Sequence, residues 1–170
     1  MKLLDKKEID LAIECLLNNQ IVILPTDTIY GLSSLVSQEN ELRINDLKGS
    51  SENKRLIILV SNLDQAQEFI DLNDQIIEAL QSQEPTTVIY QKQKGTLSYA
   101  IRLIQRKDLK QIIDVTGPIF STSVNKTGKD FLITHEQLKS FSENVSCFFT
   151  EELKNKPSII VDFINNKKKR

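Results

Sequence analysis

The stretch Ile21–Leu32 reads IVILPTDTIYGL and changes character halfway along. Its first part, Ile21–Leu24, is apolar, β-branched and too short for a typical helix, which predicts a strand buried on both faces. Pro25 ends this run, and hydroxyl groups, one carboxylate, a tyrosine and a glycine follow it. A core strand needs no such polar groups at its end, whereas loops at strand ends often hold ligands in helix-covered sheets. The stretch therefore predicts a buried strand that leads into a binding site.

The residues on either side of this strand predict further helices and strands. Apolar residues recur at helical spacing from Ile9 to Leu17, so a helix is expected before the strand. The polar stretch after Pro25 is interpreted as a loop, followed by a short helix at Glu39–Lys48 and a second buried strand at Leu56–Val60. Four more helices are expected: amphipathic helices at Leu63–Ile70 and Ile76–Leu80, the latter with Asp74 as its cap, a helix ending near Gly117, and a helix that starts with a Thr134 capping box and runs through Phe141. The remaining expected strands are Thr86–Tyr90, Thr96–Ile101, Ile119–Ser123, Cys147–Thr150 and Ser158–Val161.

These elements predict the fold class and the domain organisation. Strands outnumber a simple alternation with helices and one hairpin intervenes, so the expected fold is mixed α/β (α+β), with a mixed rather than a purely parallel sheet. At 170 residues the chain is long enough for one well-buried domain and short for two. We expect a single domain over residues 1–166. The basic run at 167–170 is expected to be a frayed, solvated tail.

Composition argues against several classes of protein. No segment approaches the roughly eighteen continuous apolar residues that a membrane span needs, and the first residues resemble an amphipathic helix more than a secretory signal, so no membrane contact and a cytoplasmic location are expected. Cys15 and Cys147 lie far apart and His135 is the only histidine, which argues against a zinc site; both cysteines are expected to be buried small apolar residues. A net charge of −1 leaves only a local patch for weak RNA binding.

Three polar clusters follow predicted strands or helices and form the candidate site: Thr26–Gly31, Lys48–Arg55 and Ser121–Asn125. Their hydroxyls, amides and cations include no acid–base pair of the usual kind, so they suit an anionic ligand held by many hydrogen bonds. Their lysines, together with Arg102, could neutralise a polyphosphate. Phosphoryl or nucleotidyl transfer needs little beyond positioning, charge neutralisation and usually Mg²⁺.

Each cluster also has a purely structural interpretation. Thr26 and Asp27 could form a turn, Lys48–Arg55 a solvated loop, Arg102 an edge charge, and Ser121–Asn125 a turn beside the Gly-Pro pair that precedes the strand. The structural interpretations of all three clusters would have to hold together for the predicted site to be absent.

One short motif points to a different chemistry. Residues 123–126 read SVNK and match SxxK, the pattern of serine acyl-enzymes, so acyl transfer through Ser123 is an alternative. The match lacks a recognisable SDN or KTG partner, and the serine follows a strand. The chain has neither a Walker loop nor a GxGxxG fingerprint, so nucleotide binding cannot be argued from either motif.

Taken together, the motifs resemble the YrdC/TsaC family of threonylcarbamoyl-AMP synthases over nearly the whole chain. LPTDTIYGL is similar to the family's PT(D/E)TxYGL, and STSVN with Gly128 is similar to its STSANxSG. The other matches are Lys48 at the lysine of the family's KxR loop, Lys54 at the position before its PL strand, Pro85-Thr86-Thr87 at the end of PGPxT, Ala100-Ile101-Arg102 at AVR, and PSIIVD at PSTIVD. The resemblance implies a YrdC/RibB-like twisted mixed sheet, with helices around a concave central cavity.

The resemblance also implies an activity. The chain would be a nucleotidyltransferase that condenses L-threonine, bicarbonate and ATP, with Mg²⁺ bound to ATP, to threonylcarbamoyl-AMP and pyrophosphate. A separate tRNA-modifying transferase would take the product and use it to modify adenosine next to the anticodon. The implied substrate-binding residues are Thr26, Thr28, Tyr30, Thr87, Arg102, Ser121 and Ser123, and the implied nucleotide-binding residues are Lys48, Lys54, Arg55, Ser123 and Asn125. Lys48, Lys54 and Arg102 would stabilise charge in a template mechanism, with no acid–base residue and no metal ligand from the protein.

The chain departs from the family pattern at several positions. Ser50 stands where the KxR loop has arginine, and Arg55 is a candidate to reach the same phosphate. Gln83-Glu84 replaces a proline and a glycine, and the family's closing Arg-Pro-Gly segment is not seen after PSIIVD. We therefore expect altered ATP affinity or reduced activity. The alternative function is a non-catalytic RNA-binding or ribosome-maturation module of the same fold.

Overall fold

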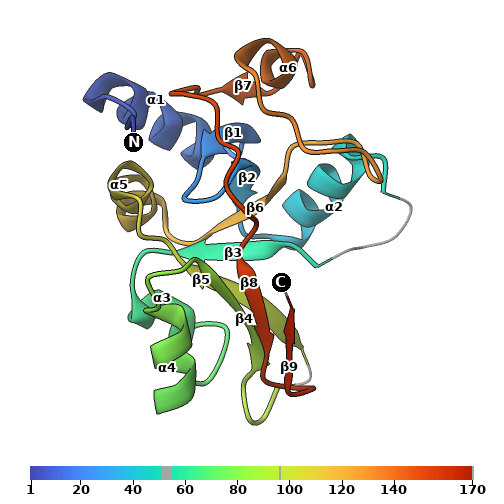
Figure 1. The fold of residues 1–170 in the computed structure, drawn as a ribbon. Coiled ribbons are helices and arrows are strands. Elements are labelled where there is room, and N and C mark those ends of the chain that lie inside the picture. The colour runs from blue at the N-terminus through green and yellow to red at the C-terminus, as the bar shows by residue number, and fades with distance from the viewer. Residues whose placement is uncertain (51–54, 96, 170) are drawn as a thin grey trace.

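The computed structural model describes residues 1–50, 55–95 and 97–169. The centre of this part of the chain is a mixed sheet of nine strands in the order β7-β1-β2-β6-β3-β5-β4-β8-β9 (Figure 1). The helices are α1 Lys6–Leu17, α2 Gln38–Leu47, α3 Leu63–Gln67, α4 Asp74–Leu80, α5 Lys107–Thr116 and α6 His135–Lys139. The strands are β1 Val22–Pro25, β2 Tyr30–Leu35, β3 Ile57–Val60, β4 Thr86–Gln91, β5 Ser98–Leu103, β6 Ile119–Ser123, β7 Ser146–Cys147, β8 Ile159–Asp162 and β9 Lys167–Lys169. None of the helices described is long and apolar enough to cross a membrane.

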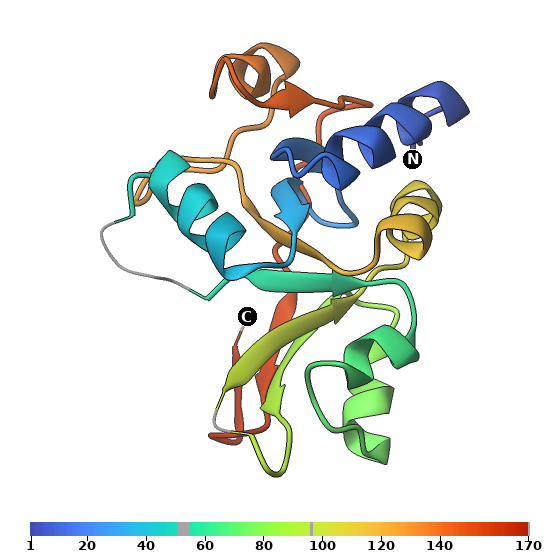
Figure 2. The ribbon, with the colours of Figure 1, turned by 180° about the vertical axis from the view of Figure 1, so that it is seen from behind.

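Both faces of the sheet carry a hydrophobic cluster, because successive residues of a strand point to opposite sides. On one face Val22 and Leu24 pack with residues of α1 and α5, which lie side by side (Figures 1 and 2). On the other face Ile23 belongs to a cluster with apolar residues of α2, α3, α4 and α6. All four residues of β1 are buried. The predicted strand buried on both faces is confirmed, as is the mixed sheet.

Local sequence sets where the short helices begin. The predicted capping box of Thr134 is present at α6, where Thr134 accepts from the Gln137 N–H and the Gln137 side chain reaches back to the cap. At α4 the prediction is wrong by one residue. The cap is Asn73, whose side chain accepts from the N–H of Ile76. Asp74 is instead the first helical residue, where its negative charge still favours the positive end of the helix dipole.

The stretch Tyr30–Leu35, interpreted from the sequence as part of a polar loop, is strand β2. It pairs antiparallel with β1 on one side and with β6 on the other. Its serines are buried: Ser33 and Ser34 are fully covered, and the Ser33 hydroxyl donates to the backbone carbonyl of Gly31. The polar composition of this segment predicts a loop, but the segment is a core strand. Only residues 26–29 remain as the turn between β1 and β2.

The basic run at 167–170, expected as a frayed tail, is a strand over Lys167–Lys169. This strand, β9, pairs antiparallel with β8. The Asp162 carboxylate closes the turn by accepting from two backbone N–H groups at 2.9 and 3.0 Å, and Asn166 adopts a positive φ of 54°. The turn directs the chain back along β8, so the lysines extend the sheet. Exposed lysines are common on edge strands, where they discourage pairing with another chain.

Three predicted elements are shorter than expected. α3 ends at Gln67 rather than at Ile70. α6 ends at Lys139 rather than running through Phe141. β7 contains only Ser146–Cys147 and does not continue to Thr150. The backbone N–H of Thr150 instead donates to the hydroxyl of Tyr30 at 2.9 Å, so it is not available to a strand ladder.

The two cysteines are partly buried rather than fully buried as expected. Burial raises the pKa of the Cys15 thiol, with a smaller contribution from the charge of Glu14. Burial also raises the pKa of Cys147, to about 11. Both thiols are therefore protonated at neutral pH, and a protonated thiol is a poor nucleophile.

Candidate functional site

A hollow of about 230 Å³ lies at the middle of the sheet, and none of the helices in the described part of the chain contributes a residue to its lining. We call it the central hollow. Its lining residues are Thr26, Thr28, Ile29, Tyr30, Gly31, Ile57, Arg102, Ser121, Thr122, Ser123, Phe131, Pro157 and Ser158. Six of the predicted site residues are among them. Hydroxyl groups and a single arginine thus meet in one place, as predicted from clusters that lie far apart in the sequence.

Strand register explains this convergence. Gly31 of β2 lies opposite Ser123 of β6, and Ser121 of β6 lies opposite Ile57 of β3. Alternation along each strand directs these side chains to the same face, together with Arg102 of β5. The strands β2, β6, β3 and β5 are consecutive in the sheet (Figure 1). The floor of the site is therefore built on neighbouring strands, and the turn between β1 and β2 and the loops before α6 and β8 complete its wall.

Arg102 supplies a buried positive charge to the central hollow. The residue is only 4% exposed. One terminal nitrogen lies 3.4 Å from the Thr28 Oγ1, and the other lies 3.3 Å from Asp27 Oδ1. The edge-charge interpretation fails because β5 is an interior strand, between β3 and β4. A planar guanidinium beside hydroxyl groups suits a carboxylate or a phosphate.

The threonines of the β1–β2 turn have different tasks. The Thr26 hydroxyl accepts from the backbone N–H of Thr28 at 3.1 Å and donates to the carbonyl of Ile29, so it forms the turn. The Thr28 hydroxyl lies 3.1 Å from that of Thr26 and faces Arg102. The turn interpretation is thus correct for Thr26, and Thr28 is the better ligand contact.

Lys48 reaches the end of β6 from the end of α2. Its ammonium donates to Asn125 Oδ1 at 2.9 Å, to the Ser123 hydroxyl at 3.3 Å and to the Ser123 carbonyl. The lysine is buried, with 9% of its surface exposed. The residues of two predicted clusters, at 48 and at 121–125, are therefore in direct contact. The solvated-loop interpretation does not hold for Lys48.

The contacts of Ser123 argue against a serine acyl-enzyme. Its hydroxyl donates to Asn125 Oδ1 at 2.6 Å and accepts from the Lys48 ammonium. In the SxxK pattern the lysine of the motif is the partner of the serine, so Lys126 would have to lie against Ser123. Lys126, the lysine of the SxxK match, instead donates to the carbonyl of Leu47 and lies 5.1 Å from the ring centroid of Phe141.

Thr87 contributes to the site through a neighbour. It pairs with Arg102 across β4 and β5, and its hydroxyl lies 2.7 Å from that of Ser158. Ser158 lines the central hollow and is itself buried. The sequence interpretation assigned no role to Ser158, although it lies in PSIIVD. The position of Ser158 at the start of a predicted strand was the available signal.

Of the predicted cations that the structure describes, Arg102 lines the central hollow, Lys48 contacts its lining residue Ser123, and Arg55 is not part of it. The Arg55 guanidinium is exposed and donates to the hydroxyl of Ser98, and its contact with a phosphate stays a prediction. Lys54 lies outside the described residues. Arg102 and Lys48 are the cations that the described part of the chain brings to this region.

Tyr30 lines the central hollow but its hydroxyl points elsewhere. The phenol oxygen accepts from the N–H of Thr150 and donates to the carbonyl of Glu151 at 2.7 Å. Its ring stacks on Phe149, with centroids 5.4 Å apart. Tyr30 therefore joins the segment 149–151 to the site wall, and its contact with a ligand is limited to the remaining ring and backbone surface.

Gly31 permits the close approach of Ser121. A Cβ at Gly31 would lie 2.1 Å from the Ser121 Oγ and 3.2 Å from a methyl of Thr26. We expect Gly31→Ala to destabilise the fold by about 1–3 kcal/mol, because the serine hydroxyl must leave its position. Urea unfolding measures this change. Gly31→Ala combined with Ser121→Ala removes the clashing oxygen and should recover much of the loss, whereas equal instability of the two variants would contradict this explanation.

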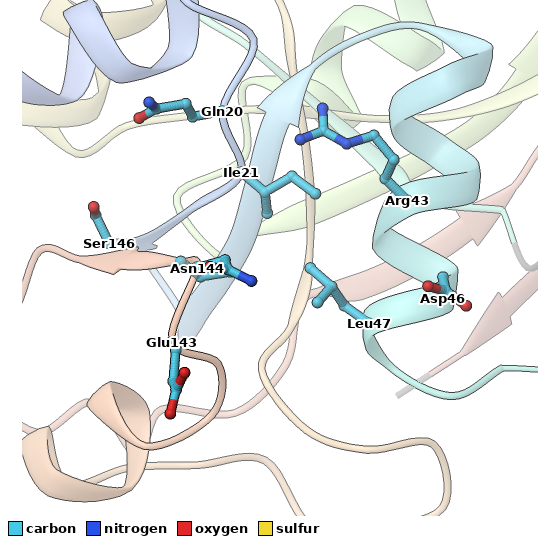
Figure 3. A pocket seen from close by; sticks show the side chains of 9 residues that line it. Gln20, Ile21, Arg43, Asp46, Leu47, Glu143, Asn144 and Ser146 are labelled. Carbon is cyan, nitrogen blue, oxygen red and sulfur yellow. The ribbon is translucent and has the colours of Figure 1, made fainter.

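A second hollow, of about 410 Å³, lies between α2, residues 20–21 and the segment 143–146 (Figure 3). None of the predicted site residues lines it. Its arginine, Arg43, already donates to the carbonyl of Asn19 at 2.8 Å and to Asn40 Oδ1 at 2.6 Å. This larger hollow lacks a convergent set of polar groups directed at a ligand, so the central hollow is the candidate site.

The fold and the central hollow together define a class: α/β proteins that present a buried cation and several hydroxyl groups at the middle of a mixed sheet. The family model for the Sua5, YciO and YrdC proteins, described as "Telomere recombination", matches residues 14–170. The chain belongs to this family, which confirms the predicted resemblance.

Individual relatives agree with this assignment. The chain is 31% identical over 141 residues to the threonylcarbamoyl-AMP synthase of Haemophilus influenzae (strain 86-028NP), covering 74% of this chain and 77% of that protein. It is 25% identical over 181 residues to the threonylcarbamoyl-AMP synthase of Pseudoalteromonas translucida (strain TAC 125), covering 96% and 97%.

Solved structures confirm the predicted fold. P. abyssi Sua5 complexed with L-threonine matches with a TM-score of 0.83 at 20% identity, over 96% of this chain and 53% of that chain. The structure of E. coli YciO matches with a TM-score of 0.78 at 17% identity, over 94% of this chain and 85% of that chain. The chain therefore spans about half the length of Sua5 and most of the length of YciO.

Proposed function

We propose that the chain is a threonylcarbamoyl-AMP synthase, which condenses L-threonine, bicarbonate and ATP to threonylcarbamoyl-AMP and pyrophosphate. The observation that carries this proposal is the meeting of buried Arg102 with the hydroxyls of Thr28, Ser121 and Ser123 in a hollow of about 230 Å³. Pockets for drug-sized ligands usually measure about 300–1,000 Å³, so this hollow suits a smaller molecule such as an amino acid. The activity named for two of the relatives supports the same reaction.

The residues of the site divide between threonine and ATP. In this proposal Arg102 binds the carboxylate of threonine, and the hydroxyls around it bind the rest of that molecule. Lys48 and Asn125, in contact at the end of β6, meet the phosphates of ATP. Lys54 is a further proposed phosphate ligand. Mg²⁺ enters on ATP, because this ion commonly binds through substrate phosphates and keeps several of its waters.

The reaction needs charge stabilisation more than proton transfer by a side chain. The amine of threonine combines with bicarbonate, with loss of water, to give a carbamate. A carbamate oxygen then forms a bond to the α-phosphorus of ATP as the bond to pyrophosphate breaks. The protein holds the two reactants together and neutralises their negative charges, and these two effects account for most of the proposed catalysis.

The test is to mix the purified chain with ATP, Mg²⁺, ¹⁴C-bicarbonate and L-threonine. We expect pyrophosphate release that depends on threonine, together with labelled carbon in a nucleotide product. L-Valine, which has the shape of threonine without its hydroxyl, is the matched control and should support little release. Absence of threonine-dependent release would overturn the proposal.

The same experiment addresses the non-catalytic alternative. RNA binding that falls steeply with salt, in a preparation that releases no pyrophosphate, would favour an RNA-binding module. If the enzyme is active, we propose that a separate tRNA-modifying transferase takes up its product. Addition of such a transferase and tRNA to the reaction would then move the labelled carbon into the tRNA.

A further inference from the structure

Asp27 lies beside the central hollow without lining it. Its side chain is 8% exposed, and both carboxylate oxygens are buried without a hydrogen-bond partner among the residues that the structure describes. Burial of a carboxylate is costly unless a cation compensates for the lost water. The compensating cation is Arg102, whose terminal nitrogen lies 3.3 Å from Asp27 Oδ1.

The turn between β1 and β2 does not need this carboxylate. The hydroxyl of Thr26 makes the turn's side-chain hydrogen bonds, to the N–H of Thr28 and to the carbonyl of Ile29. Asp27 makes none of them. A structural role in the turn therefore leaves the choice of a carboxylate at this position unexplained.

Asp27 can affect a ligand only through Arg102. Its oxygens have essentially no accessible surface, so a molecule in the central hollow does not touch them. Arg102 lines the hollow and meets consecutive residues of one turn, Asp27 at one terminal nitrogen and Thr28 at the other. Contacts at both terminal nitrogens restrict rotation of the guanidinium plane.

We propose that Asp27 is a positioning residue, whose buried carboxylate fixes the guanidinium of Arg102 in the orientation that meets the anionic group of the ligand. The carboxylate also offsets the charge of Arg102 before a ligand arrives. Binding then depends on the direction of the guanidinium donors and not only on net charge. The identification of the ligand as threonine rests on the proposed function, whereas the positioning role of Asp27 does not.

The test compares Asp27→Asn and Asp27→Glu with Asp64→Asn, which removes an exposed carboxylate on α3 as a matched control. One readout is the NMR signal of the Arg102 Nε–H group. The other is the pair kcat and KM for threonine-dependent pyrophosphate release, corrected for the folded fraction.

We expect Asp27→Asn to shift the Arg102 signal and to lower kcat/KM by about 10- to 100-fold, because misplacement by about 1 Å can cost this much. Asp27→Glu keeps the charge but moves it, so we expect a smaller signal shift and a smaller loss. Asp64→Asn should match the wild type. A merely structural role for Asp27 would reduce the folded fraction and leave the Arg102 signal and KM of the folded protein unchanged.

Wild-type signal and kinetics in folded Asp27→Asn would overturn the proposal. If that variant does not fold, an unchanged Arg102 signal in Asp27→Glu has the same meaning. The NMR readout requires no turnover. A wild-type chain without threonine-dependent release would therefore refute the proposed function, while the Arg102 signal would still decide the role of Asp27.

Discussion

Replacement of Arg102 with alanine is expected to lower kcat/KM for threonine-dependent pyrophosphate release by roughly 10- to 150-fold, or about 1.5–3 kcal/mol of transition-state stabilisation. The guanidinium is buried and lines the central hollow. Alanine removes its charge and all of its donors at once. The measurement is initial rate against threonine concentration, normalised to the folded fraction. Arg102→Lys should recover only part of the activity, because an ammonium does not reproduce a planar fork.

A change in stability must be separated from this loss of activity. Arg102→Ala leaves the buried carboxylate of Asp27 without its ion-pair partner, which is destabilising. Arg102→Ala combined with Asp27→Asn removes both charges and should recover stability without recovering activity. Arg43→Ala, which removes a guanidinium from the second hollow, is the matched control and should keep wild-type kinetics. Wild-type turnover in folded Arg102→Ala would refute the assigned role.

The fold could be predicted where apolar pattern and burial agree. The run Ile21–Leu24 is apolar and strand β6 begins with the apolar pair Ile119 and Phe120, and both strands were predicted with nearly correct bounds. β2 could not be predicted this way, because Ser33 and Ser34 are polar in composition yet fully buried. Their hydroxyls donate to backbone carbonyls within the same strand, and these hydrogen bonds offset the free-energy cost of burying a polar group. A rule that counts hydroxyls as surface residues fails at such a strand.

The candidate site could be predicted as a set of residue types but not as a set of contacts. Hydroxyl clusters at strand ends and an arginine at the end of a predicted strand are visible in the sequence. Which of them touch depends on the strand order, which places β6 between β2 and β3 and β3 beside β5. Thr28 and Arg102, 74 residues apart, meet for this reason, and Thr87 and Ser158, 71 residues apart, meet because β4 pairs with β8. Local pattern contains no information on such long-range register.

The other large effect is expected away from the ligand, at the ion pair of Arg106 and Asp108. Both residues are at most 2% exposed, and they form two contacts, at 2.7 and 3.0 Å. Asp108 also accepts from the backbone N–H groups of Leu4 and Leu109, and Arg106 donates to the carbonyl of Lys2. The pair therefore ties the first residues of the chain to the start of α5.

Arg106→Ala is expected to lower the free energy of unfolding by about 3–5 kcal/mol, because it leaves the Asp108 carboxylate buried without a cation. Asp108→Ala should cost a similar amount, since it leaves a buried guanidinium and two backbone donors unsatisfied. Urea unfolding with linear extrapolation measures both. Lys6→Ala breaks the exposed Lys6–Asp10 pair, whose side chains are 91% and 62% exposed, and as the control it should change stability by less than about 0.5 kcal/mol.

The double replacement Arg106→Met with Asp108→Leu distinguishes the source of this loss. If the cost arises from an uncompensated buried charge, the apolar pair should be clearly more stable than either alanine variant, although it still lacks the bonds to Leu4 and Leu109. If the loss of stability in the double variant instead equals the sum of the losses in the two alanine variants, each side chain stabilises the fold through its own packing. Arg106 also lies 3.4 Å from the hydroxyl of Thr150, whose N–H binds the Tyr30 phenol at the wall of the central hollow. An increase in KM for threonine in the apolar pair would then show that this network also holds the ligand site in place.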